Sequence, residues 1–140
     1  MDFQNEKCVI VIDEQLPVGL LANTAAILGI TLGKKLPDAV GADVIDQSGN
    51  EHLGIIEIPV PILKGTPKII RELREKLYQP DFSDVIAADF SDLAQSCKTY
   101  AEFTEKMGQV SENALHYLGI AIYGTKKKIN KLTGSMPLLR

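Results

Sequence analysis

The chain contains 140 residues, of which 45% are hydrophobic and 24% charged, and these proportions exclude a disordered or fibrous protein. Its length suits one domain with a full hydrophobic core, so we expect a single domain over residues 1–140. The net charge of −3 conceals a basic end, because residues 126–140 hold five basic side chains and no acidic one.

The first seven residues argue against export. Met1–Lys7 is acidic before it is basic and has no apolar stretch, which is not the pattern of a signal peptide. The two cysteines, Cys8 and Cys97, are too few for a framework of disulfides. We therefore expect a cytoplasmic protein with both thiols reduced.

A buried strand and an apolar helix are predicted next. Lys7–Asp13 reads as a strand, and the chain breaks at Leu16-Pro17. The helix covers Val18–Gly33, and no charged side chain lies between Glu14 and Lys34. It is shorter than the roughly 20 residues that span a membrane, and it contains Asn, Thr and Thr, so we expect a helix buried in the protein core.

The middle of the chain predicts a hairpin-like pair of strands and a second helix. Strands Ala42–Asp46 and Leu53–Ile58 flank the turn Gln47–Asn50. Pro59 and Pro61 place the end of the second strand at a sheet edge or outside the sheet. Thr66-Pro67 then begins a helix, as N-cap and first helical residue. Its apolar stripe consists of Ile69, Ile70, Leu73 and Leu77.

The C-terminal half continues the alternation of strands and helices. The predicted elements are a strand Asp84–Asp89, a helix that starts at the capping box Thr99–Glu102 and stops at Gly108, a strand His116–Tyr123, and a basic helical turn Lys126–Leu132. This alternation predicts an α/β fold, a three-layer α/β/α sandwich around a mixed, mostly parallel sheet.

Two aspartates are candidate site residues because both end apolar strands. Asp13 and Asp89 would share one rim if their strands run the same way, since ligand crevices in open α/β sheets lie at the strand carboxyl ends. The helix start at Val18, Gly19 and Leu20 would add backbone N–H groups but no base, nucleophile or cation. The alternative is that each carboxylate caps the turn that follows it.

No metal or cofactor is expected. The two histidines, His52 and His116, and the two cysteines show no close spacing of the kind that metal ligands have. The junction between the first strand and helix has no glycine-rich phosphate loop.

Two stretches resemble the type II peptidyl-tRNA hydrolase fold. They are Val9–Asp13 with the helix start Gly19–Ala26, and Ile120–Gly124 with Ile129–Gly134 and Leu138-Leu139. More narrowly, the sequence is similar to an uncharacterised bacterial family of about this length that shares the fold. The segment Phe90–Glu112 looks like an insertion in that fold.

The resemblance implies a changed site. The hydrolase family carries lysines and a histidine on its first helix, where this chain has Val18, Leu20 and Ile27, while Asp89 and Thr133-Gly134 are retained. Thr24 would face the crevice if the helix is oriented as in that family. Loss of a cation that stabilises a developing oxyanion commonly costs about 3 kcal/mol.

We therefore expect a ligand- or RNA-binding protein that lacks the catalytic cations of the hydrolases. The alternative is a hydrolase of an acyl or aminoacyl ester, resembling peptidyl-tRNA, with Asp89 as base and the amides at Val18–Leu20 as oxyanion donors.

The basic end is a candidate anion or RNA-backbone patch. Lys126, Lys127 and Lys128 precede Thr133 and Gly134 on one short helix, but no aromatic residues lie between the lysines to stack on bases. The alternative is a solvated turn. A small ligand or tRNA is the expected partner, and neither DNA nor a membrane is expected.

The first helix also predicts a homodimer. Small residues Ala22, Ala26, Gly29 and Gly33 lie on one face, and leucines lie on the neighbouring face. A helix that is apolar nearly all round needs cover on both sides, from this chain or from a second subunit. The dimer contact would use Ala22–Gly33 or the strand edge near Pro59.

Overall fold

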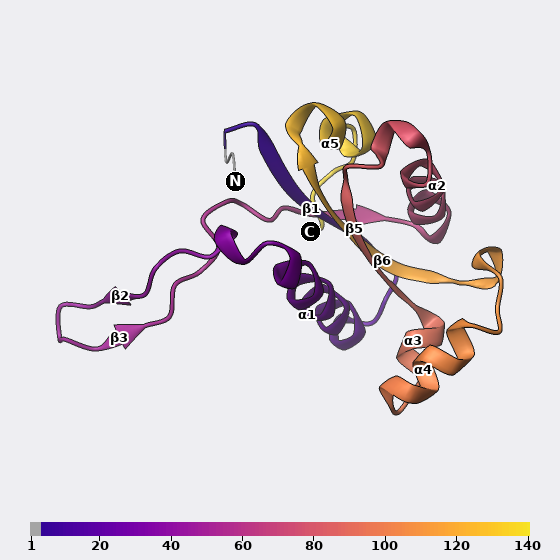
Figure 1. The fold of residues 1–140 in the computed structure, drawn as a ribbon, viewed down its shortest axis with the longest axis horizontal. Coiled ribbons are helices and arrows are strands. Elements are labelled where there is room, and N and C mark those ends of the chain that lie inside the picture. The colour runs from indigo at the N-terminus through magenta and orange to yellow at the C-terminus, as the bar shows by residue number, and fades with distance from the viewer. Residues whose placement is uncertain (1–3) are drawn as a thin grey trace.

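A four-stranded sheet forms the centre of the protein (Figure 1). The computed structural model describes residues 4–140, so the prediction for Met1–Lys7 rests partly on residues outside the described range. The strand order is β4 (Ile62–Gly65), β1 (Glu6–Asp13), β6 (Tyr117–Thr125) and β5 (Ile86–Ser91).

The sheet is mixed, as predicted, but it is not mostly parallel. β1 and β4 pair in parallel, whereas β6 is antiparallel to both of its neighbours, β1 and β5. β1, β4 and β5 do run in one direction, but β6 inserts between β1 and β5 in the opposite one. The long segment 92–116 between β5 and β6 is compatible with a crossover to a parallel strand, so the sequence pattern did not reveal this return.

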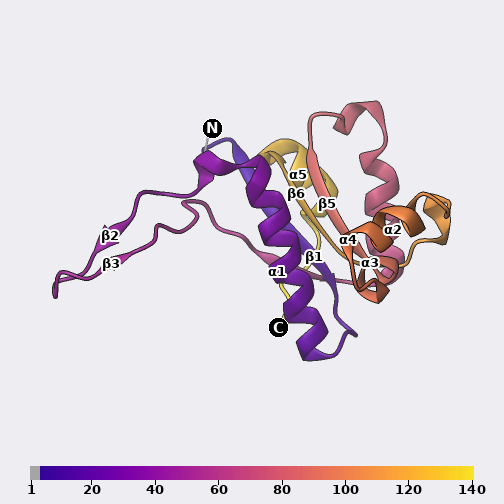
Figure 2. The same cartoon turned by 60° about the horizontal axis from the view of Figure 1, so that its bottom comes forward.

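Helices cover both faces of the sheet (Figures 1 and 2). Helix α1 (Val18–Lys35) packs on one face, and α2 (Pro67–Leu77) and α5 (Lys126–Thr133) pack on the other. Two apolar clusters result, because side chains alternate along each strand. The cluster beneath α1 includes Ile10, Ile12, Leu28 and Phe90, and the opposite cluster includes Val11, Ile70, Ile120 and Ile129.

Helix boundaries follow the predicted caps. Thr66 Oγ1 accepts the Ile69 N–H at 3.2 Å, and Thr99 Oγ1 accepts the Glu102 N–H at 3.1 Å. The second of these opens α4 (Tyr100–Met107), which follows the short α3 (Asp92–Ser96). Short 3₁₀ turns, η1 (Pro37–Ala39), η2 (Pro80–Phe82) and η3 (Glu112–Ala114), complete the fold. Among residues 4–140, no helix combines the length and apolarity needed to cross a membrane.

The two central strands predicted from the sequence are wrong in extent and place. Ala42–Asp46 reduces to β2 (Val44–Ile45). Leu53–Ile58 forms no strand, and β3 (Glu51–His52) lies just before it; β2 and β3 pair only with each other. They belong to a hairpin arm, residues 40–57, that extends away from the sheet (Figures 1 and 2). Their apolar residues face solvent, so the pattern that indicates a buried strand does not indicate burial here.

The strand that joins β1 is instead β4, which the sequence prediction missed. Pro59 and Pro61 precede it, and the Pro61 carbonyl accepts the Ile10 N–H at 3.1 Å. A proline has no backbone N–H to donate, but its carbonyl can accept a hydrogen bond from a neighbouring strand where the chain enters the sheet. The far side of β4 is covered by the chain end, because Lys64 N–H donates to Pro137 O at 3.0 Å and Leu139 N–H to Ile62 O at 2.9 Å. β5 is therefore the less protected edge of the sheet.

We predict that Leu28→Ala destabilises the protein by about 2–5 kcal/mol, because Leu28 is fully buried between α1 and the sheet and its truncation leaves a cavity. Val18→Ala on the same helix is the control. Val18 is 83% exposed, so its truncation should change the free energy of unfolding by at most about 0.5 kcal/mol. Urea unfolding of both variants measures the difference, and equal effects would contradict the packing described for α1.

Candidate functional site

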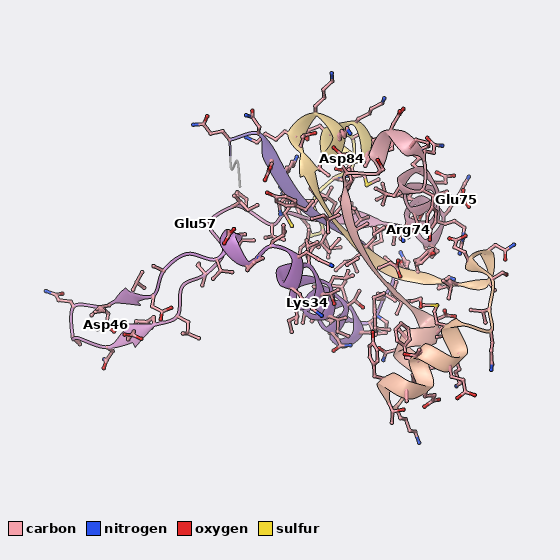
Figure 3. All side chains as sticks on the ribbon, in the orientation of Figure 1. Lys34, Asp46, Glu57, Arg74, Glu75 and Asp84 are labelled. Carbon is pink, nitrogen blue, oxygen red and sulfur yellow. The ribbon has the colours of Figure 1, made fainter. Side chains whose placement is uncertain are left out.

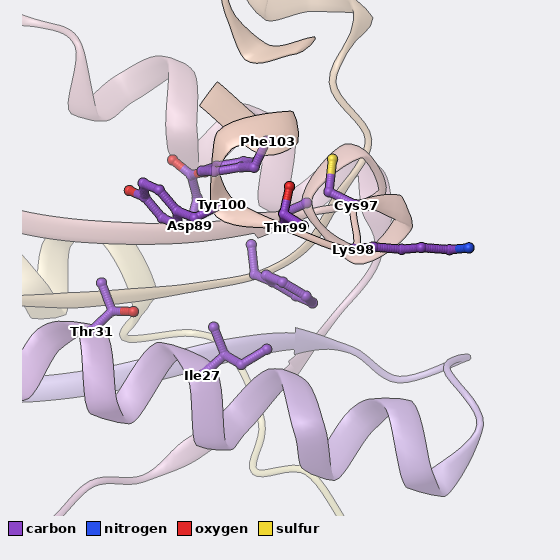
Figure 4. Close-up of a pocket in the computed structure, with 10 residues that line it drawn as sticks. Ile27, Thr31, Asp89, Cys97, Lys98, Thr99, Tyr100 and Phe103 are labelled. Atoms are coloured by element: carbon purple, nitrogen blue, oxygen red, sulfur yellow. The ribbon is translucent and has the colours of Figure 1, made fainter. Parts of the chain in front are cut away.

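A cavity of about 420 Å³ lies along the edge strand β5, between α1 and α4 (Figure 4). It is lined by Ile27, Thr31, Asp89, Phe90, Ala94, Cys97, Lys98, Thr99, Tyr100 and Phe103. Its volume is within the range of small-molecule sites. Helix α1 and the segment from β5 to α4, which are distant in sequence, therefore build one concave surface.

The cavity combines an apolar lining with a few polar groups. Ile27 and Thr31 project from α1 toward it, and Tyr100 and Phe103 face them from α4, whereas the Lys98 side chain extends away (Figure 4). The two rings of α4 pack edge to face, with centroids 5.5 Å apart. Such a lining suits an amphipathic ligand better than a highly charged one.

One cysteine, Cys97, lines the cavity. Cys97 Sγ lies 3.2 Å from the Leu93 carbonyl, to which its S–H donates. The other cysteine, Cys8, is 2% exposed in the core, and burial raises the pKa of its thiol to about 11. Thiol chemistry in residues 4–140 is therefore confined to Cys97.

Asp89 lines the cavity from the edge strand β5, and its carboxylate is directed toward α2, where an arginine contacts it. Arg74 Nε lies 3.2 Å from Asp89 Oδ2, but the N–H is not directed along this contact, so Nε makes no hydrogen bond within residues 4–140. Burial raises the pKa of Asp89; the charge of Arg74 opposes this shift, and the charge of Glu112 adds to it. A carboxyl group with a raised pKa beside a cavity is typical of functional sites.

A second ion pair fixes the segment that leads into β6. Arg71 Nη1 lies 3.1 Å from Glu112 Oε1, and the Arg71 guanidinium also donates to the Leu115 carbonyl. Tyr117 Oη donates to Glu112 Oε1 at 2.7 Å, and burial is the main cause that raises the pKa of Tyr117. This network borders Asp89 electrostatically and joins α2 to the start of β6.

No group of three or more His, Cys, Asp or Glu side chains in residues 4–140 is arranged to hold a metal ion.

The sequence matches the family described as "Protein of unknown function (DUF2000)" over residues 6–140. The chain belongs to the DUF2000 family. Its fold is similar to that of Atu0240, a protein of unknown function from Agrobacterium tumefaciens strain C58, with a TM-score of 0.85. The two are 16% identical, over 96% of this chain and 97% of that chain, so the likeness concerns the fold. No curated protein matches the sequence.

In this DUF2000 protein the two predicted aspartates have different surroundings. Asp89 lines the cavity, although it lies within β5, which continues to Ser91, and does not end the strand. Asp13 is 5% exposed, and its Oδ1 accepts the Gln15 N–H at 2.9 Å. Asp13 thus caps a turn, the alternative considered from the sequence.

The start of α1 does not join Asp89. Val18 and Gly19 are exposed, Leu20 is half-buried, and none of them lines the cavity. Thr24 is fully buried, and its hydroxyl donates to the Leu20 carbonyl at 2.8 Å. Thr24 lies on the side of α1 that packs against the sheet, whereas the Asp89 carboxylate contacts Arg74 of α2 on the other side of the sheet.

The predicted residues of α5 are divided between its two ends. Lys126 and Lys127 are exposed at its start, and Lys128 Nζ lies 2.6 Å from Asp84 Oδ1, a contact that lowers the pKa of Asp84. At the other end, the buried Thr133 hydroxyl donates to Ile129 O at 2.9 Å. Gly134 ends the helix, and its N–H donates to Asn130 O. Thr133 and Gly134 therefore have structural partners.

Sequence reasoning missed most of the cavity. Thr31, Cys97, Tyr100 and Phe103 were not among the predicted site residues. The capping box placed α4 correctly, and the i, i+3 aromatic pair was a usable signal for an apolar face. Nothing in the sequence places that face opposite α1.

We predict that two substitutions shift the pKa of Asp89 in opposite directions. Arg74→Gln removes a positive charge and should raise it further, whereas Glu112→Gln removes a negative charge and should lower it. Carboxyl ¹³C chemical shifts followed through a pH titration measure both changes. Shifts in the same direction would contradict the electrostatic description.

The same shift fixes the sign of a pH effect on stability. The folded protein binds the Asp89 proton more tightly than the unfolded chain, whose reference pKa is 3.8, so ionisation of Asp89 opposes folding. This penalty is absent below pH 3.8 and complete above the raised pKa.

Proposed function

We propose that this DUF2000 protein binds a small amphipathic molecule in the cavity between α1, β5 and α4. The supporting observation is the cavity itself: about 420 Å³, with Ile27, Phe90 and Phe103 for an apolar body and the Thr31 hydroxyl for a polar group. Small-molecule sites combine a mostly apolar lining with few polar groups in this way.

The fold is proposed to be of the type II peptidyl-tRNA hydrolase kind, and the resemblance supports binding without that family's chemistry. On this resemblance Ile27 stands where the hydrolases have a histidine, and Asp89 stands at their aspartate. Both residues line the cavity. An isoleucine cannot transfer a proton. The proposed site therefore has the same location as that of the hydrolases but lacks the histidine that accompanies their aspartate.

The alternative, hydrolysis of an acyl or aminoacyl ester, is favoured by one observation, the raised pKa of Asp89 beside the cavity. It lacks a set of oxyanion donors, because Val18–Leu20 do not line the cavity. Release of amino acid from aminoacyl-tRNA that disappears in Asp89→Asn would favour this alternative over binding alone.

We predict that phenylacetate, used as a probe, shifts the amide resonances of Thr31, Asp89 and Phe103 with an affinity of about millimolar, as its size allows. Thr31→Trp should abolish the shifts by filling the cavity. Thr104→Trp is the control, since Thr104 is an exposed threonine of α4 outside the lining. Two-dimensional NMR reports the result. Equal binding by both variants, or none by the unmodified protein, would refute the proposed site.

RNA binding is a second candidate, and a groove of about 410 Å³ between η2 and α5 favours it. Lys127, Lys128 and Lys131 line the groove and supply the charge that a phosphate backbone requires. Asp81 also lines it, and Asp84 pairs with Lys128, so the positive potential is reduced there.

If the groove binds RNA, replacing Lys127, Lys128 and Lys131, the lysines that line it, with Gln should weaken tRNA retention in a filter assay. The slope of log affinity against log salt should decrease in magnitude by about two to three, one unit for each lost phosphate contact. A control that replaces Lys68, Lys76 and Lys98, exposed lysines elsewhere, has the same net charge. Equal losses in both variants would indicate a net-charge effect, and no retention by the unmodified protein would exclude this candidate.

A further inference from the structure

The hairpin arm, residues 40–57, exposes large apolar side chains to solvent. They are Val40, Val44, Ile45, Leu53, Ile55 and Ile56, which are 36–81% exposed. Apart from its base, the arm pairs only with itself. An isolated two-stranded hairpin is marginally stable in water, and an apolar patch of this kind marks an interaction surface.

The arm nevertheless has a defined shape. At its tip, Asp46 Oδ1 accepts the Ser48 and Asn50 N–H groups at 2.9 and 3.0 Å, and Gly49 adopts a φ of +88° that favours glycine. At its base the two strands approach so closely that a Cβ on Gly54 would lie 1.9 Å from the Gly41 carbonyl oxygen. The arm is therefore preorganised to present its apolar side chains.

Helix α1 offers a second apolar surface. Its inner side is buried through Thr24, Leu28 and Leu32. The exposed residues of its outer face are Val18, Gly19, Ala22, Asn23, Ala26, Gly29, Ile30 and Gly33, with Val18 83% and Ile30 78% exposed. No charge interrupts this face before Lys34.

A groove connects the two surfaces. A cavity of about 210 Å³ at the base of the arm is lined by Gly29 and Gly33 of α1 and by Val40 and Ile56 of the arm. The remaining lining residues are also apolar: Cys8, Ile10, Leu32, Leu36, Ala39 and Val60. The outer face of α1 thus continues into the arm without a charged boundary.

The distribution of charges indicates which partner covers the outer face of α1. The arm carries Asp43, Asp46, Glu51 and Glu57 and no lysine or arginine. Lys34 and Lys35 end α1 and form no ion pair within residues 4–140. Figure 3 shows Lys34 on α1, with Asp46 and Glu57 on the arm that leads away from it. The arm therefore complements α1 in both apolarity and charge, and it extends away from the helix of its own chain (Figures 1 and 2).

We propose that two copies of this chain form a two-fold dimer in which each hairpin arm lies across the outer face of its partner's α1. In a two-fold dimer both contacts form together, because each subunit contributes its arm to one contact and the outer face of its α1 to the other. The arm and the outer face together contain about the 20–30 residues a side that a stable interface of standard size uses. The acidic arm lies near the partner's lysines.

Cross-linking between two differently tagged chains tests the contact. Both chains carry Cys97→Ser; one adds Ile55→Cys on the arm, and the other adds Ile30→Cys on α1. Cys8 is buried and does not compete. A short bis-maleimide should join the two chains, since groups at an interface react at an effective concentration of about millimolar. Val110→Cys, at an exposed apolar position outside both surfaces, replaces Ile30→Cys in the control.

Light scattering provides the second test. The unmodified protein at about 100 μM should have the mass of a dimer, and Ile55→Asp should weaken the dimer by roughly 30-fold or more. Val110→Asp should leave the dimer unchanged. Circular dichroism checks that each variant is folded. A monomeric unmodified protein, a dimer indifferent to Ile55→Asp, or equal cross-linking with Val110→Cys would overturn the proposal, and the cross-linking result decides if Ile55→Asp fails to fold.

Discussion

The double pairing of β6 is the constraint on which the rest of the structure depends. Residues 117–123 are all buried, and they pair antiparallel with β1 on one side and with β5 on the other. Because β6 opposes both neighbours, β1 and β5 must run the same way and end at the same side of the sheet. The register shift between Phe90 and Ser91 then turns the chain out of β5 into α3, next to the cavity. The position of the cavity thus follows from the strand order.

The ion pair of Arg71 and Glu112 holds the return path to β6 in place. Both side chains are partly exposed, so the pair itself adds little free energy of folding. Its value is directional: Arg71 also binds the Leu115 carbonyl, and Glu112 accepts from Tyr117 at the first residue of β6. Segment 92–116 therefore leaves the edge at β5 and returns beside it, which keeps the aromatic face of α4 opposite α1.

Local signals in the sequence predicted most helices and strands. The sequence could not predict which of these elements pack against one another. Thr66 and Thr99 predicted the starts of their helices correctly, because N-capping is an interaction among neighbouring residues. β4 was missed because Pro59 and Pro61 read as the end of a strand, whereas here they introduce one. For the site, Asp89 was found from its place after an apolar run. Tyr100 and Phe103 became part of the site only when the fold brought α4 across β5 from α1.

Helix α1 has no charged side chain before Lys34, and each of its three sides has a separate physical reason for this absence. A helix that is apolar nearly all round is expected to be buried nearly all round, but the structure buries only one side, through Leu28 and Leu32. A second side, through Ile27 and Thr31, lines the cavity, where a charge would oppose binding of the amphipathic ligand that we propose. The third carries Ile30 into solvent, an exposure that burial within one subunit does not explain. The absence of charge along this last side is what a contact with a second, equally apolar surface requires.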